Sequence, residues 1–120
     1  MRHQKKLKKL GLPKPHRTSL LRNLVLSLIL NGKLRTTDSR AKALSGRFDR
    51  LMRFARTKEK RDLIRALPTF LPGYKDKIGL GKKIDDLKIR FEKRTSGFTR
   101  ITRVGLRKGD NASLVQIEFI

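Results

Sequence analysis

The excess of positive charge is the feature of this sequence that most restricts how the chain can fold. Its 120 residues contain 32 Lys and Arg against 10 Asp and Glu, which gives a formal net charge of +22. Such an excess destabilises a compact fold by self-repulsion unless a polyanion neutralises it. Nucleic acid is the obvious polyanion, because each neutralised phosphate also releases counterions. We therefore expect a chain of marginal stability that is stabilised by binding nucleic acid.

The positive charge is concentrated toward the N-terminus. Residues 1–60 hold 18 basic and 3 acidic side chains, or +15, whereas the rest of the chain holds 14 and 7, or +7. Residues 1–17 carry seven basic side chains and no acid. Because Gly11, Pro13 and Pro15 disfavour a helix there, we interpret this segment as an arm that becomes ordered against RNA. A disordered solubilising tail is the alternative.

The remainder, residues 18–120, is expected to form one globular domain, since a hydrophobic content of 37% suffices for a modest core. Residues 19–31 predict a first helix, which Gly32 can end. The apolar positions from Leu20 to Leu30 cover most of its surface, which indicates a helix that is buried on nearly all sides. This apolar run is far shorter than the roughly 20 residues that span a bilayer.

A brief strand at Lys33–Thr37 and a second helix at about residues 38–56 are expected next. The apolar residues of this helix fall within roughly 100° of arc and predict a stripe that faces the core. These residues are Ala41, Leu44, Phe48, Leu51, Met52 and Ala55. The remaining surface is rich in Arg, and we interpret it as a partial RNA contact, with a solvated face as the alternative.

The following segment predicts two shorter helices. The third helix is expected at about residues 58–67 and ends before Pro68, because proline disrupts a helix interior. Three glycines within residues 72–82 indicate a loop. A fourth helix is expected at about residues 82–93, where apolar residues recur at spacings of three and four.

The end of the chain predicts a β-hairpin. Residues 98–106 are rich in Thr, Ile, Val and Phe, as strands are. Residues 113–119 alternate, with Val115, Ile117 and Phe119 on one face. The two segments are joined by a turn at 107–111, where Gly or Asn can take a positive φ. Arg100 and Arg103 should point to opposite faces because side chains alternate along a strand. The predicted order is therefore α-β-α-α-α-β-β, an α+β fold.

Motifs for cofactor chemistry are incomplete. The chain has no Cys, which excludes disulfides, thiolate metal sites and a catalytic thiol. The segment 79–83 resembles a phosphate-binding loop only superficially, because Asp76 stands at the position of the first Gly and Lys83 at that of the magnesium-binding hydroxyl. We expect no nucleotide or other cofactor.

The remaining titratable residues do not form a catalytic group. His3 and His16 are the only histidines, and two histidines without nearby carboxylates cannot complete an ordinary zinc shell. Asp85 and Asp86 are adjacent on the predicted fourth helix, so their side chains point about 100° apart. We therefore expect neither a metal site nor an enzyme, and no small-molecule substrate.

A series of short motifs runs in order along nearly the whole chain. They are Met1-Arg2-His3, His16-Arg17, Arg22-Asn23, Thr36-Thr37, Ala41-Lys42-x-Leu44, Arg56-Thr57, Ser96-Gly97-Phe98-Thr99-Arg100-Ile101, Gly109-Asp110-Asn111-Ala112 and Ile117-Glu118. In this order they resemble the L-seventeen family, the seventeenth protein of the bacterial large ribosomal subunit. The family usually has Gly-Gly-Tyr where this chain has Ser96-Gly97-Phe98, so any hydrogen bond of that Tyr hydroxyl is lost. Residues 58–89 match poorly, and no functional residue is carried over from them.

The resemblance implies a two-layer fold with helices against a small sheet. It also implies a structural protein of the large subunit near the polypeptide exit region, with large-subunit rRNA and neighbouring ribosomal proteins as partners and without a cofactor. The ribosome in question would be that of the cytoplasm or of an organelle. The residues that we predict to bind rRNA are Arg2, His3, Lys5, Lys6, Lys8, Lys9, Lys14, His16, Arg17, Arg22, Arg40, Lys42, Arg100 and Lys108.

Three other classes of protein are alternatives. A DNA-binding protein would present a helix to the major groove, but residues 32–38 predict a strand rather than a tight turn between helices. An enzyme acting on RNA lacks an acid–base group in this sequence, and a cleavage or modification assay would test it. A cationic membrane-surface protein would sediment with vesicles.

Overall fold

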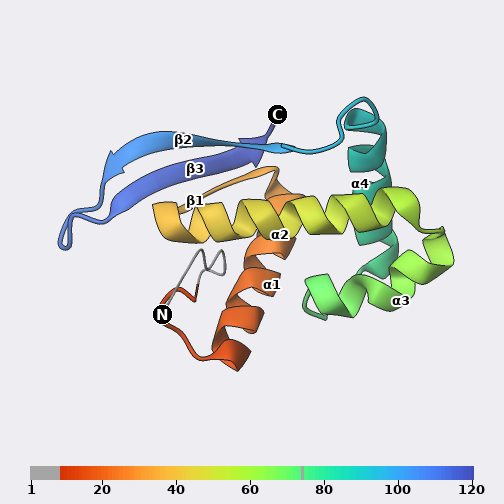
Figure 1. Cartoon of the computed structure of the whole chain (residues 1–120), viewed down its shortest axis with the longest axis horizontal. Coiled ribbons are helices and arrows are strands. Elements are labelled where there is room, and N and C mark those ends of the chain that lie inside the picture. The colour runs from red at the N-terminus through yellow and green to blue at the C-terminus, as the bar shows by residue number, and fades with distance from the viewer. Residues whose placement is uncertain (1–8, 74) are drawn as a thin grey trace, which may run out of the picture.

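The computed structural model describes residues 9–73 and 75–120. Along the chain lie α1 (Lys14–Asn31), β1 (Lys33–Thr37), α2 (Asp38–Thr57), α3 (Lys60–Phe70), α4 (Lys77–Arg90), β2 (Thr99–Leu106) and β3 (Ser113–Phe119). The predicted order of elements is confirmed. The sheet lies over α2, with the other helices gathered beneath and beside that helix, which confirms an α+β fold with a C-terminal hairpin (Figure 1).

The sheet is antiparallel and its strand order is β1-β3-β2, so β3 is the central strand. Leu34 of β1 and Ile101 of β2 both align with Ile117 of β3, which is fully buried. Paired residues share a face, so these three side chains belong to the face that packs on the helices. Arg100 and Glu118 align on the opposite face, which is open to solvent.

The core lies between α2 and the sheet. All six residues of the predicted stripe on α2 are buried, which confirms that prediction. Phe48 of this stripe has its ring centroid 5.0 Å from that of Phe119, and Phe91 lies 5.2 Å from Phe98 and 6.0 Å from Phe119. Tilted and edge-on ring pairs of this kind stabilise a core beyond the burial of their area. The four rings therefore join helix, sheet and the end of α4.

Helix α1 begins five residues before the predicted start at residue 19. Pro13 occupies the N-cap position and Pro15 lies in the first turn, where the missing N–H of proline leaves no hydrogen bond unmade. The predicted burial on nearly all sides is also wrong, because only Val25, Leu28 and Ile29 are buried and the other leucines of this helix are half-buried. Gly32 ends the helix with φ at 78°, as predicted.

Helix α3 extends past the proline that was expected to end it. Pro68 lies inside the last turn, and the helix continues to Phe70, where the amide of Leu71 still donates to the carbonyl of Leu67 at 2.8 Å. The predicted start was also too early, since Glu59 is the N-cap residue. A proline so near the end removes a single backbone hydrogen bond, which the packing of Leu63 and Leu67 can offset.

Helix α4 begins five residues earlier than predicted, within the stretch that was expected to be a loop. Asp76 caps it, and its side chain accepts a hydrogen bond from the amide of Gly79 at 2.9 Å. A Cβ at position 79 would collide with the Asp76 carboxylate. The glycine therefore serves the helix cap rather than a loop.

The hairpin has the predicted turn chemistry. Gly109 and Asn111 both take a positive φ, at 104° and 54°. The register shifts between Arg103 and Gly105, where a bulge interrupts the pairing of β2 with β3. Arg103 aligns with buried Val115 and Arg100 with Glu118 on the outer face, so the two arginines point to opposite faces as predicted.

Candidate nucleic-acid interface

The residues of the predicted arm fall into two groups. Five of its predicted rRNA-binding residues lie outside the described part of the chain: Arg2, His3, Lys5, Lys6 and Lys8. Of the others, Lys9 is exposed before a turn, and Lys14 and His16 are exposed on the first turn of α1. Arg17 is half-buried and donates from Nη1 to the carbonyl of Leu12 over 3.5 Å. The end of the predicted arm is therefore helical.

Two arginines from different helices converge on the end of α3. Arg22 of α1 donates from Nε to the carbonyl oxygen of Thr69 over 3.3 Å, and Arg47 of α2 donates from Nη2 to the same oxygen over 2.9 Å. Thr69 lies in the last turn of a helix, where carbonyl groups lack partners within the helix and the dipole is negative. Two guanidinium groups thus share one acceptor and are held close together.

The surroundings of this pair are cationic. Burial lowers the pKa of Arg47, and the charges of Arg22 and Arg50 lower it further. The Nε of Arg47 is buried without a hydrogen-bond partner among the described residues. None of the ion pairs in residues 9–73 and 75–120 includes Arg22, Arg47 or Arg50. These three residues, which we call the arginine junction, form a cationic group that makes no ion pair with a carboxylate among the described residues.

The two predicted residues near the start of α2 differ in their charge environment. Arg40 is exposed. Lys42 forms an ion pair with Asp38 one turn earlier, with Nζ 2.9 Å from Oδ2. Arg40 is thus available to an anion in full, whereas the charge of Lys42 is partly compensated by its carboxylate partner.

The remaining predicted residues lie on the sheet, away from the arginine junction. Arg100 donates from Nη2 to Oε1 of Glu118 at 2.7 Å, and this hydrogen bond lowers the pKa of the Glu118 carboxyl. Lys108 is exposed in the hairpin turn, which projects from the molecule at the end opposite to α3 and α4 (Figure 1). The predicted rRNA-binding residues therefore do not form one compact site.

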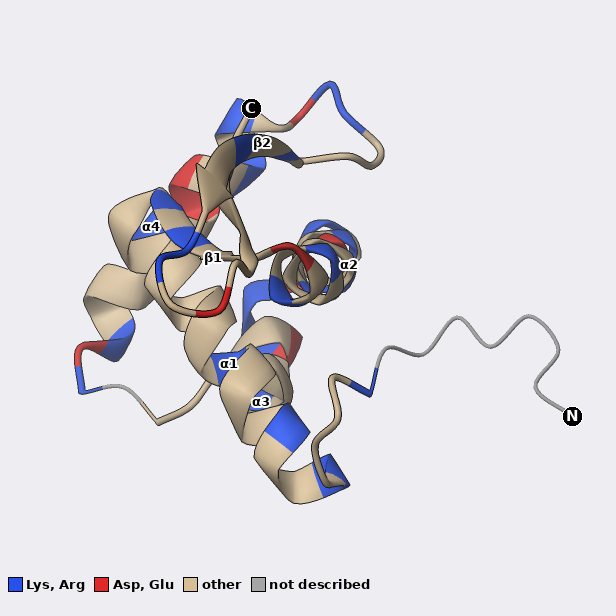
Figure 2. Cartoon of the chain, turned by 90° about the vertical axis from the view of Figure 1, so that its left-hand side faces the viewer, with Lys and Arg blue, Asp and Glu red and all other residues tan. Residues whose placement is uncertain are grey.

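Figure 2 shows Lys and Arg distributed over all the labelled helices and the hairpin, with fewer Asp and Glu among them. Arg47 and Arg50 were predicted only as members of an Arg-rich helix surface, because nothing in the sequence shows that the end of α3 meets α2 beside them. Arg56, on the same helix, instead donates to the backbone carbonyls of Glu92 and Arg94 and so holds the segment after α4. Tertiary structure thus divides the arginines of α2 between structural contacts and a free cationic surface.

Two kinds of site are absent from the described residues. Within 9–73 and 75–120, no cluster of three or more His, Cys, Asp or Glu side chains could hold a metal ion. None of the helices in these ranges is long and apolar enough to cross a membrane.

The fold and its surface define a small α+β protein with a cationic junction between its helices. The family model of ribosomal protein L17 matches residues 20–120 of the chain. The chain therefore belongs to the ribosomal protein L17 family, and its role is that of a structural ribosomal protein.

Relatives from several bacteria match along the whole chain. The protein of Campylobacter jejuni named large ribosomal subunit protein bL17 is 35% identical over 120 residues, which cover 100% of this chain and 99% of the relative. The proteins of the same name from Rickettsia bellii and Rubrobacter xylanophilus are each 37% identical over the full chain, which spans 82% and 96% of their lengths.

Proposed function

We propose that this chain is a structural constituent of the large ribosomal subunit that binds and stabilises folded large-subunit rRNA near the polypeptide exit region, and so supports translation. The name of its relatives supports the large subunit. The exit region, the rRNA and the neighbouring ribosomal proteins are what the family resemblance implies. On this proposal the chain works in a cytoplasmic or organellar ribosome, without catalytic activity or a cofactor.

The arginine junction is the observation that carries the rRNA-binding part of the proposal. One carbonyl oxygen is a partial charge only, and it cannot neutralise two guanidinium groups that converge on it with a third nearby. A phosphate oxygen is fully anionic, and a guanidinium has further donors in a planar fork that matches phosphate geometry. A backbone phosphate at this junction would therefore relieve the repulsion among Arg22, Arg47 and Arg50.

Contacts of this kind position a protein without reading a base sequence. Specificity would come from the shape of the folded RNA, which must bring phosphates to the junction and to the exposed cations of the predicted set, among them Arg40 and Lys108. The pairing of β1 with β3 supports RNA rather than a DNA groove, because a strand separates α1 from α2 where a DNA-binding helix pair would have a tight turn.

The experiment is a salt titration of binding to large-subunit rRNA fragments by a double variant, Arg22→Gln with Arg47→Gln. Loss of two phosphate contacts should lower the slope of log affinity against log salt by roughly 1.4–1.8, taking about 0.7–0.9 for each contact. The single variant Arg47→Lys keeps the charge but loses the planar fork. It should therefore weaken binding while leaving most of the slope.

A second double variant serves as the control. Arg61→Gln with Arg103→Gln removes the same charge from two exposed positions outside the junction. Unfolding of each free protein in urea separates a binding defect from lost stability, since Arg22 and Arg47 also bond to α3. If both double variants lower the slope equally at matched stability, the junction is no special phosphate site and the proposal loses its support.

A further inference from the structure

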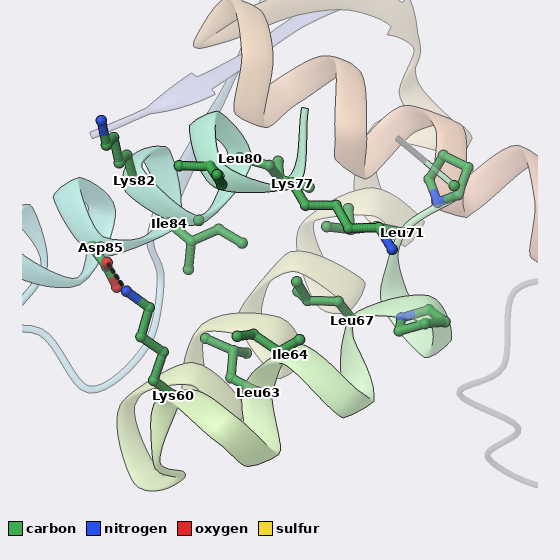
Figure 3. A pocket seen from close by; sticks show the side chains of 15 residues that line it. Lys60, Leu63, Ile64, Leu67, Leu71, Lys77, Leu80, Lys82, Ile84 and Asp85 are labelled. Carbon is green, nitrogen blue, oxygen red and sulfur yellow. Dashed lines mark ion pairs between the residues drawn. The ribbon is translucent and has the colours of Figure 1, made fainter. Parts of the chain in front are cut away.

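An apolar groove lies between α3 and α4 (Figure 3), at the end of the molecule opposite to the hairpin turn (Figure 1). It has a volume of about 400 Å³. Figure 3 shows Leu63, Ile64 and Leu67 of α3 on one wall and Leu80 and Ile84 of α4 on the other. Nearly all of its interior is aliphatic, and its charged residues are three Lys and one Asp.

Two large apolar side chains at this groove remain in contact with water. Ile64 is 56% exposed and Ile78 is 77% exposed. Burial of apolar area is favourable by about 25 cal/mol/Å², and apolar patches that stay exposed commonly mark sites of protein–protein contact. The groove therefore has surface whose free energy would fall if a partner covered it.

The rim of the groove is cationic. Lys60, Lys77 and Lys82 are among the residues that line it, and the acidic residue with them is Asp85. Figure 3 shows Lys60 reaching Asp85, Lys77 beside Leu71 and Lys82 on the outer side of α4. Oδ2 of Asp85 lies 3.9 Å from Nζ of Lys60, so Lys60 is paired. Lys77 and Lys82 have no ion pair among the described residues. A segment that fits both the interior and the rim would be apolar at its centre and acidic at its flanks.

Other occupants fit this combination less well. RNA could approach the lysines, but an aliphatic interior gives its phosphates no donors, and none of the described lining residues is aromatic and able to stack on a base. The first 12 residues of this chain contain leucines, yet they also carry five basic side chains and no acid, so the rim would repel them in this copy or another. Charge complementarity therefore favours a different protein.

We propose that the groove between α3 and α4 binds a segment of a neighbouring protein that presents aliphatic side chains flanked by Asp or Glu. The aliphatic side chains enter between Ile64 and Ile84, while the carboxylates pair with Lys77 and Lys82. This proposal rests on the proposed function in one respect, since it takes the partner from the neighbours within the ribosome. It adds a protein-binding surface that is separate from the arginine junction.

The first test uses the unaltered chain in purified large subunits that contain it. A carbodiimide joins a Lys amine to a carboxylate in direct contact without a spacer, and peptide mass spectrometry then identifies both residues. We expect Lys77 or Lys82 to be joined to Asp or Glu of another protein, beside aliphatic residues in that protein's sequence. Absence of any such link from either lysine, while other lysines of the chain react, would overturn the proposal.

A second test uses a photoreactive residue in living cells. Benzoylphenylalanine is introduced at Ile64 or at Ile78, and at Ile89 as a matched control, because Ile89 is 73% exposed on α4 but does not line the groove. The two groove positions should cross-link to the same acidic and aliphatic protein segment, and the control should not. Three results would contradict the proposal: cross-links to rRNA alone, cross-links to a basic protein segment, and a yield no higher than that of the control.

The two proposals fail in distinguishable ways. Unaltered rRNA binding by the Arg22 and Arg47 double variant bears on the proposed function alone. Missing cross-links in subunits that contain the chain bear on the groove alone.

Discussion

Phe48 connects the helices to the sheet, and its replacement by Ala tests the core in a single step. The side chain is fully buried, and its ring centroid lies 5.0 Å from that of Phe119 on the central strand. An aromatic side chain buries on the order of 150–250 Å², which at about 25 cal/mol/Å² is worth about 4–6 kcal/mol. Ala retains part of this, so we expect Phe48→Ala to lower the free energy of unfolding by about 3–5 kcal/mol.

A loss of this size would bring the isolated chain near the point of unfolding. Small domains are stable by only about 5–15 kcal/mol, and a net charge of +22 lowers the stability of this one further. Urea unfolding followed by far-ultraviolet circular dichroism suits a chain that has no Trp. A bound rRNA fragment at 100 times its dissociation constant should restore about 2.7 kcal/mol if it binds the folded state only.

The matched control is Phe70→Ala. Phe70 is half-buried at the end of α3, with its ring centroid 5.9 Å from that of Phe54, so its removal should cost clearly less. A loss for Phe48→Ala below about 1 kcal/mol, which is typical of ordinary substitutions, would refute the assignment of Phe48 to the core. An equal loss in both variants would show that the contact of Phe48 with Phe119 contributes no more to stability than the half-buried pair of Phe70 and Phe54.

Three further predictions concern other parts of the chain. Deletion of residues 2–12 removes five basic side chains and leaves Pro13 at the N-cap of α1. If all five contact phosphate, the slope of log affinity for rRNA against log salt should fall by roughly 3.5–4.5. An unchanged slope would show that the arm takes no part in binding. Leu28→Asp buries an unpaired charge in α1, and native-like amide exchange protection in this variant would contradict the burial of that residue. The pKa of Asp110 is lowered from 3.8 to about 2, chiefly by a hydrogen bond from Arg107 and further by one from the amide of Ala112. Because the pKa is depressed, these contacts stabilise the folded hairpin above about pH 4, and the stabilisation is lost as the pH falls through about 2. A carboxyl NMR titration can check this, and Asp110→Asn should abolish the pH dependence.

Elements with a regular hydrophobic period could be predicted from the sequence. The stripe on α2 and the alternation at Val115, Ile117 and Phe119 both match the buried residues. The errors lie where one residue type has two structural uses. Pro15 was taken as a helix breaker but stands in a first turn, and Gly79 was taken as part of a loop but makes room for a helix cap.

The cationic surface was less predictable than the fold. Composition identifies the basic residues. The shared contact of Arg22 and Arg47 with Thr69, however, joins three helices whose contacting residues lie far apart in sequence. The pairing of Lys42 with Asp38 was visible in the sequence, because residues four apart are neighbours on a helix. A carboxylate one helical turn from a cation therefore reduces the charge that the cation offers to RNA.

The central position of β3 has a consequence for how the chain is made. β1 and β2 do not pair with each other, and both depend on the strand that is synthesised after them. While a ribosome translates this chain, the helices are completed first, and the sheet cannot cover the apolar face of α2 until β3 is complete at residue 119. A premature stop before residue 113 would therefore remove the whole sheet rather than one strand of it, and the released fragment would expose both a hydrophobic helix face and an unneutralised cationic surface.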